Sequence, residues 1–167
     1  MSALPIRRFP DPLLKRPTRY VERLDGDAQR LIEAMVRTMR HHPRCVGLAA
    51  PQVGGDLRIA VMDSSRSPKA EDSRGLLILV NPRIDAREGA VIRREGCLSI
   101  PDFTADVRRA VRVHLMALDR EGRACEWWLE GFEAIIAQHE VDHLDGLLFL
   151  DRVANLATDV FRRKTYL

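Results

Sequence analysis

Apolar residues recur at helical spacing in LDGDAQRLIEAMVRTMRHH, residues 24–42. At about 100° per residue they share one side of a helix, which is typical of an amphipathic helix lying on a core. These residues are Leu31, Ile32, Met35, Val36 and Met39. Asp25 or Asp27 could cap the first turn, and Pro43 marks the end. The pattern predicts one helix before residue 43.

Short apolar or alternating runs follow and predict β-strands. They are LRIAVMD at 57–63, GLLILVNPRI at 75–84 and AVRVHLMALD at 110–119. DREGR at 119–123 predicts the turn of a hairpin whose second arm contains Trp127 and Trp128, and NLATDVFRRK at 155–164 predicts a last helical turn or two. Strands between helices, without regular alternation, predict an α+β fold of mostly antiparallel sheets packed around a central helix at 131–144.

That central helix carries polar residues where leucines would be expected. Phe132, Ile136, His139 and His143 fall on one side of it. In the pattern His139-Glu140-x-x-His143, two imidazoles one turn apart can hold one metal ion, with Glu140 beside them to act on a metal-bound water. The alternative is a pair of hydrogen-bonded core histidines.

A third metal ligand must come from upstream or be an aspartate, because no His, Glu or Cys follows His143. This argues against metalloproteases that take a later Glu or His as the third ligand. It directs attention to Cys97 in REGCLSIPDF, although a lone cysteine on a strand is more often a small buried residue.

Length and composition limit the class of protein. A length of 167 residues with 46% hydrophobic residues predicts a single compact domain over 1–167. There is no apolar run near 18 residues, so no membrane role is expected. A net charge of +3 from 27 basic and 24 acidic residues argues against sequence-specific nucleic-acid binding. Three widely spaced cysteines fit a reducing, cytoplasmic compartment, with an organellar origin left open.

Three ordered segments resemble those of the peptide deformylase family. They are GLAAPQ at 47–52, EGCLS at 95–99 and QHEVDH at 138–143. The resemblance extends over most of the chain and implies that Cys97, His139 and His143 bind a divalent metal, with water in the fourth position. It implies Fe²⁺ as the ion, with Zn²⁺, Ni²⁺ or Co²⁺ able to occupy the same ligands.

The resemblance also implies a reaction, the removal of the formyl group from N-formylmethionyl peptides with release of formate. Glu140 would take a proton from the water and pass it to the leaving amine. The Gln52 side chain and the Leu98 backbone N–H would donate hydrogen bonds to the oxyanion of the intermediate.

Substrate contacts are implied more loosely. Backbone near Val46 and Gly47 would pair with an extended formyl-Met peptide. An apolar pocket would bind the methionine side chain of this peptide, lined by Val46, Phe132, Ile135 and Ile136. The alternative is that these four residues only pack in the hydrophobic core. Glu95 and Arg109 would form an ion pair behind the site. The alternative for that pair is two separate surface charges.

The chain departs from the family pattern at several positions. Cys45 stands where many members have glycine, Arg93 where an apolar residue is expected, and Glu133 and Ile135 replace a common apolar residue and an arginine. The tail after Asp151 is short, and only FRRK at 161–164 is locally basic, so contact with the ribosome would be weak.

Two other functions stay open from the sequence. A zinc peptidase of the H-E-x-x-H kind would cleave unformylated peptides. A metal-binding scaffold without turnover would have had no reason to keep Cys97, His139, Glu140, His143 and Gln52 together.

Overall fold

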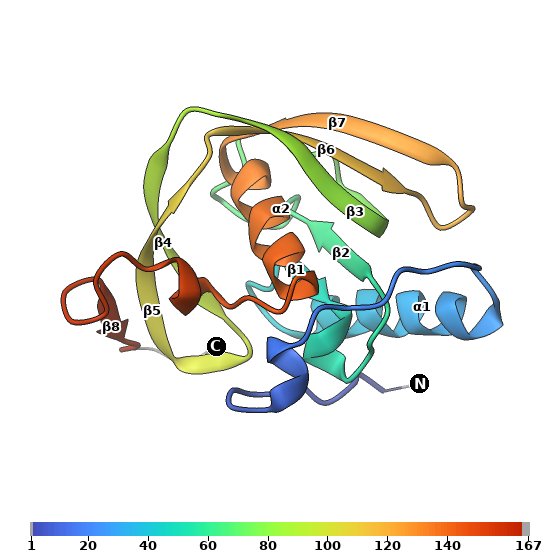
Figure 1. The fold of residues 1–167 in the computed structure, drawn as a ribbon, viewed down its shortest axis with the longest axis horizontal. Coiled ribbons are helices and arrows are strands. Elements are labelled where there is room, and N and C mark those ends of the chain that lie inside the picture. The colour runs from blue at the N-terminus through green and yellow to red at the C-terminus, as the bar shows by residue number, and fades with distance from the viewer. Residues whose placement is uncertain (1, 165–167) are drawn as a thin grey trace.

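The computed structural model describes residues 2–164, and residues 1 and 165–167 lie outside the described residues. Two antiparallel sheets lie around helix α2 (Gly131–Leu144), with helix α1 (Gly26–His41) against the larger sheet (Figure 1). This confirms the α+β fold predicted from the order of the elements.

The larger sheet has five strands in the order β1-β2-β3-β6-β7. Their bounds are β1 Gly47–Ala49, β2 Ile59–Asp63, β3 Leu76–Glu88, β6 Arg112–Leu118 and β7 Ala124–Glu130. Three predicted strands correspond to β2, β3 and β6, and the predicted hairpin joins β6 to β7. Asp119 N–H donates to the Arg123 carbonyl across its turn at 2.9 Å. Strand β1 forms one edge of this sheet.

The smaller sheet has three strands in the order β4-β5-β8, with bounds β4 Val91–Cys97, β5 Ile100–Arg109 and β8 Val160–Arg162. The chain passes from β3 to β4 and from β5 to β6 after only two residues each time, so the two sheets share one corner (Figure 1). The Val111 N–H donates to the Glu88 carbonyl there at 3.0 Å. The corner places β4 and β5 beside α2.

The two helices meet their surroundings in different ways. In α1, the Asp25 carboxylate accepts the N–H groups of Asp27 and Ala28, each at 3.0 Å, so Asp25 is the N-cap. Ile32, Met35 and Met39 face the core. In α2, eleven of fourteen residues are buried, so its polar side chains must find partners inside the protein.

The prediction of helical turns in the tail holds for one turn only, in which the Asp159 N–H donates to the Asn155 carbonyl at 2.9 Å. Short 3₁₀ segments occur at Pro12–Lys15, Ala50–Val53 and Phe149–Arg152. Residues Val160–Arg162 form strand β8 instead, paired with Phe103–Ala105 of β5. An open strand edge supplied partners for the backbone, and this outweighed the weak local helical pattern. No helix of the described residues has the length and apolar character needed to cross a membrane.

Candidate metal centre

Three potential metal ligands converge from two elements. Cys97 ends β4, and His139 and His143 lie one turn apart on α2. One ligand atom from each lies within 4.8 Å of the others, and the Cys97 Sγ is 3.3 Å from the His143 Nε2. The structure therefore brings together the three residues that the sequence had indicated, which we call the ligand triad.

The chemistry of the ligand triad fits a divalent ion. Burial would raise the pKa of the Cys97 thiol, but the adjacent His143 and His139 outweigh it and hold this pKa well below its usual value. A thiolate is the form that binds metals. His139 Nδ1 is 2.9 Å from Glu95 Oε2, which leaves Nε2 as the nitrogen available to an ion. Cysteine with two histidines suits Zn²⁺ and Fe²⁺ alike.

A chain of charged groups supports His139 from behind. Arg109 is only 4% exposed and donates to both carboxylate oxygens of Glu95, at 2.6 and 3.0 Å. Burial would raise the pKa of Glu95, but its hydrogen bonds from Arg109 and His139 outweigh it and lower this pKa to about 2. The predicted Glu95–Arg109 pair is confirmed, and it is buried rather than at the surface.

The sequence analysis missed Asp142 and Arg152, which complete this chain of charges. Arg109 Nη1 donates to Asp142 Oδ2 at 2.6 Å, and Arg152 Nη2 donates to Asp142 Oδ1 at 2.7 Å. A signal was present, because Asp142 lies in a buried helix, and a buried carboxylate needs a cation. The sequence did not reveal which arginines would supply it.

Glu140 has a very different environment. It is 3% exposed, and its Oε2 has no hydrogen-bond partner within residues 2–164. Burial raises the pKa of Glu140 to about 7. Its carboxylate lies against Gly47, where an added Cβ would collide with it. Glycine at position 47 therefore leaves room for a carboxylate that can exchange a proton near neutral pH.

Gln52 is 2% exposed and its amide group is fixed at both ends. Its Oε1 accepts the Ala49 N–H at 2.9 Å, and its Nε2 lies 3.3 Å from the Cys97 Sγ and 3.2 Å from the Ser99 Oγ. Leu98 lies in the tight turn between β4 and β5, next to Cys97. Both predicted oxyanion donors are therefore close to the ligand triad.

Only some of the residues predicted to contact the substrate lie together in the structure. Val46 and Phe132 pack against the core cluster that contains Ile136, whereas buried Ile135 lies outside that cluster. Gly47 begins β1, whose described partner is β2 alone, so one edge of β1 is unpaired within the described residues.

Besides Ile135, three other residues that depart from the family pattern have distinct environments. Cys45 Sγ donates to the Gly47 carbonyl at 3.1 Å, and burial raises the pKa of this thiol to about 12. Glu133 is 2% exposed and accepts hydrogen bonds from Ser64 and Arg74, which fastens residues 64–74 to α2. Arg93 is exposed, and its Nη1 donates to the Ile92 carbonyl at 3.1 Å.

Comparisons with known proteins agree over nearly the whole chain. The polypeptide deformylase family model matches residues 3–159. A peptide deformylase from Alkalilimnicola ehrlichii is 46% identical over 98% of this chain and 89% of its own length, and one from Thermodesulfovibrio yellowstonii is 42% identical over 98% and 97%. The crystal structure of a peptide deformylase from Legionella pneumophila superposes with a TM-score of 0.84, at 39% identity, covering 93% of this chain and 88% of that one. This chain belongs to the peptide deformylase family.

Proposed function

We propose that this chain removes the N-formyl group from N-formylmethionyl nascent peptides as a metal-dependent hydrolase, with Glu140 as its proton carrier. The observation that carries the proposal is a buried carboxylate without a cation partner, beside a Cys/His/His ligand triad, in a chain of the peptide deformylase family.

Cys97, His139 and His143 would hold one divalent ion, and we propose Fe²⁺, with Zn²⁺, Ni²⁺ or Co²⁺ able to take its place. When bound, the ion supplies Lewis acidity at the formyl carbonyl and makes a water ligand more acidic. The sulfur and nitrogen donors support such an ion and do not choose among these metals.

Glu140 would accept a proton from the attacking water and deliver it to the amine that leaves. Its pKa of about 7 suits both steps, because a proton carrier works best when its pKa lies near the working pH. The products are formate and a peptide with a free amino group.

Gln52 Nε2 and the Leu98 backbone N–H would donate hydrogen bonds to the oxyanion that forms on the former formyl oxygen. Support comes from the fixed orientation of the Gln52 amide, since its Oε1 is held by Ala49 and only its nitrogen faces Cys97. A donor that is already oriented stabilises the transition state without a reorganisation cost.

The peptide would add as a strand along the free edge of β1, near Val46 and Gly47, a mode in which backbone hydrogen bonds supply affinity. Its methionine side chain would contact Val46, Phe132 and Ile136, which share one cluster, and Ile135 would contribute less directly.

We also propose a cytoplasmic location and at most a weak contact with the ribosome through residues 161–164. Arg162 and Lys164 are exposed, but Phe161 and Arg162 also form part of β8. Only a short basic segment is thus open to a polyanion.

The test measures formate released from a formyl-Met tripeptide by anaerobically purified, Fe²⁺-loaded protein. Glu140→Gln should retain metal and lose turnover by at least about 10²-fold, the usual contribution of a general acid–base group. A fully metallated wild-type protein that releases no formate would contradict the proposal. Cleavage of unformylated peptides would favour a peptidase instead.

A further inference from the structure

The connection between β2 and β3 is fixed to α2 by one buried carboxylate. Glu133 lies in the first turn of α2, and its side chain accepts three hydrogen bonds from this connection. The Ser64 hydroxyl donates to it at 2.8 Å, and the backbone N–H and the Nη1 of Arg74 donate to it at 3.0 and 2.8 Å. Both ends of residues 64–74, which we call the anchored loop, are therefore held at the start of α2.

The anchored loop places a lysine beside the proposed methionine pocket. The Lys69 N–H donates to the Ser67 Oγ at 3.2 Å, so the backbone turns there. The Lys69 Nζ lies 5.7 Å from the centroid of the Phe132 ring, which is within the range of a cation–π contact. Phe132 packs against the cluster of residues that would contact the methionine side chain of the substrate. The loop therefore holds a positive charge next to the aromatic residue of that pocket.

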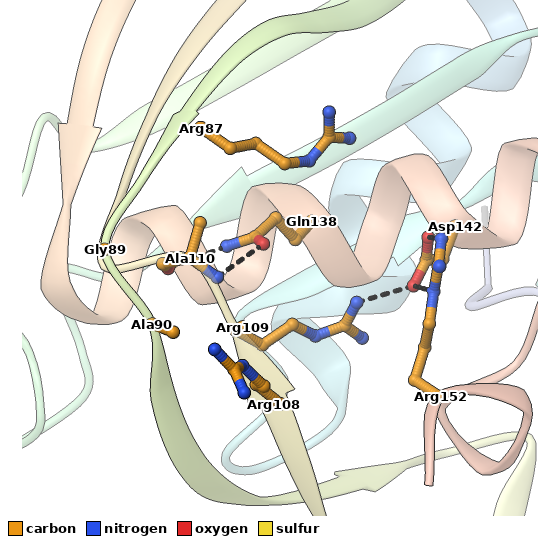
Figure 2. Close-up of a pocket in the computed structure, with 9 residues that line it drawn as sticks. All are labelled: Arg87, Gly89, Ala90, Arg108, Arg109, Ala110, Gln138, Asp142 and Arg152. Carbon is orange, nitrogen blue, oxygen red and sulfur yellow. Dashed lines mark hydrogen bonds and ion pairs between the residues drawn. The ribbon is translucent and has the colours of Figure 1, made fainter. Parts of the chain in front are cut away.

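The charge of Lys69 is unmatched, unlike that of the arginines behind the ligand triad. Arg109 and Arg152 both donate to Asp142 (Figure 2). Within residues 2–164, Lys69 pairs with no carboxylate, although Glu71 lies only two residues further along the loop. Lys69 is also exposed. Its ammonium group is therefore available to an anionic group of a bound peptide.

We propose that Lys69 determines substrate preference by binding a carboxylate on the third residue of the formyl-Met peptide, with Glu133 as the positioning residue of its loop. This preference rests on the proposed function, in which such a peptide is the substrate. The first and third side chains of an extended strand lie on the same face. A peptide whose methionine contacts Phe132 therefore directs its third side chain to the face on which Lys69 lies.

The anchor distinguishes this chain from many members of its family. Glu133 stands where an apolar residue is common, and an apolar side chain there could accept none of the three hydrogen bonds from Ser64 and Arg74. The ion pair between Glu133 and Arg74 joins a buried carboxylate to a half-exposed guanidinium, with 2% and 43% of the side chains exposed. The position of Lys69 over Phe132 thus depends on a residue that is specific to this chain.

The test measures kcat/KM for formate release from three peptides with amidated C-termini, using Fe²⁺-loaded protein at constant ionic strength. The peptides are formyl-Met-Ala-Glu, formyl-Met-Ala-Lys and formyl-Met-Glu-Ala. The wild type should prefer glutamate to lysine at the third residue by about 3-fold, because an exposed ion pair contributes only a modest free energy. Lys69→Glu should reverse this preference to about 3-fold in favour of lysine, since the sign of the charge is exchanged.

The matched control is Arg66→Glu, which makes the same change of charge at another exposed residue of the anchored loop. It should keep the wild-type preference within about 2-fold, because exposed charges away from the bound side chain are screened by salt. Glu133→Leu removes the anchor and places an apolar residue there. It should still release formate, but its preference for glutamate should fall below about 2-fold, because Lys69 is no longer held beside the peptide.

Several results would overturn the proposal. They are equal kcat/KM for the glutamate and lysine peptides, a preference for glutamate that survives in Lys69→Glu, and a reversal of equal size in Arg66→Glu. A higher kcat/KM for formyl-Met-Glu-Ala than for formyl-Met-Ala-Glu would place the carboxylate at the second residue and also overturn it.

The preference retained in Glu133→Leu would contradict the positioning role of Glu133. In all of these outcomes the protein still releases formate, so the proposed function stands. Absence of formate from every peptide would contradict the proposed function and, with it, the role of Lys69.

Discussion

Glu95 and Glu140 are both buried beside the ligand triad, yet their pKa values move in opposite directions. The pKa of Glu95 is lowered to about 2, because Arg109 and His139 overcome the effect of burial. The pKa of Glu140 is raised to about 7, because burial acts there without a cation that balances it. The two glutamates have similar exposure, so their different pKa values result from their different charge partners.

This comparison separates a supporting charge from a reactive one. Glu95 accepts hydrogen bonds on both oxygens and stays ionised, so it can orient His139 without exchanging protons. Glu140 keeps an oxygen without a partner in the described structure and can take up a proton near neutral pH.

Removal of Arg109, the cation that pairs with Glu95, should have the largest effect, which is a loss of stability. Arg109→Ala leaves the buried Glu95 without its arginine partner and leaves Asp142 with Arg152 alone. The loss should lower the free energy of unfolding by about 3 to 5 kcal/mol. Urea denaturation measures the loss. Arg108→Ala, the exposed neighbour, is the matched control and should change stability by at most about 0.5 kcal/mol. Equal losses would show that Arg109 is not the key partner.

Removing the Gln52 donor beside the ligand triad should lower the rate far more than it alters the metal content. Gln52→Ala should lower kcat by about 10²- to 10³-fold, as expected for one oxyanion donor, with the metal content unchanged. Steady-state formate release and metal analysis measure the two quantities. The control is Gln29→Ala, which changes a glutamine on α1 and should leave both kcat and the metal content unchanged. Wild-type activity in Gln52→Ala would remove this residue from the mechanism.

The space around Glu140 can be tested with one methyl group. Gly47→Ala should displace the Glu140 carboxylate and lower kcat/KM by about 10-fold, within the 1 to 3 kcal/mol that overpacking usually costs. Gly26→Ala is the control, because its added methyl group meets only the flexible end of Arg30. A Gly47→Ala protein with wild-type kcat/KM would show that the carboxylate tolerates displacement.

An exposed ion pair should give the smallest effect and a defined pH dependence. Lys15 Nζ lies 2.5 Å from Asp151 Oδ2, and the pKa of Asp151 is lowered, because Lys15 and the Leu148 N–H outweigh its partial burial. A lowered pKa stabilises the fold above the ordinary aspartate pKa of about 3.9, and this contribution disappears as the pH falls through the folded-state pKa.

Asp151→Asn should therefore reduce stability at pH 7 by no more than about 1 kcal/mol, the usual size for an exposed pair. Asparagine can still accept the Leu148 N–H, so the variant isolates the charge. The difference from wild type in thermal unfolding should shrink below about pH 4. A difference that is constant from pH 7 to pH 3 would rule out the ionic contribution.

The sequence by itself determined the elements and residues whose signals are local. The apolar spacing predicted α1 because its five apolar residues repeat within one turn of each other, and His139 and His143 share a helix face for the same reason. The lack of a later His, Glu or Cys directed attention to Cys97, and the resemblance of its segment to the peptide deformylase motif implied that it is the third ligand. Alternation likewise predicted β2, β3 and the β6–β7 hairpin.

Only the tertiary structure decided which distant groups became partners. Arg109 is 33 residues from Asp142, and Glu133 is 59 residues from Arg74, so no local pattern could link them. Val160–Arg162 of the predicted helical segment form strand β8 because β5 offered an open edge. Burial and charge pairing depend on the folded neighbourhood, and for that reason they also set Glu95 and Glu140 apart.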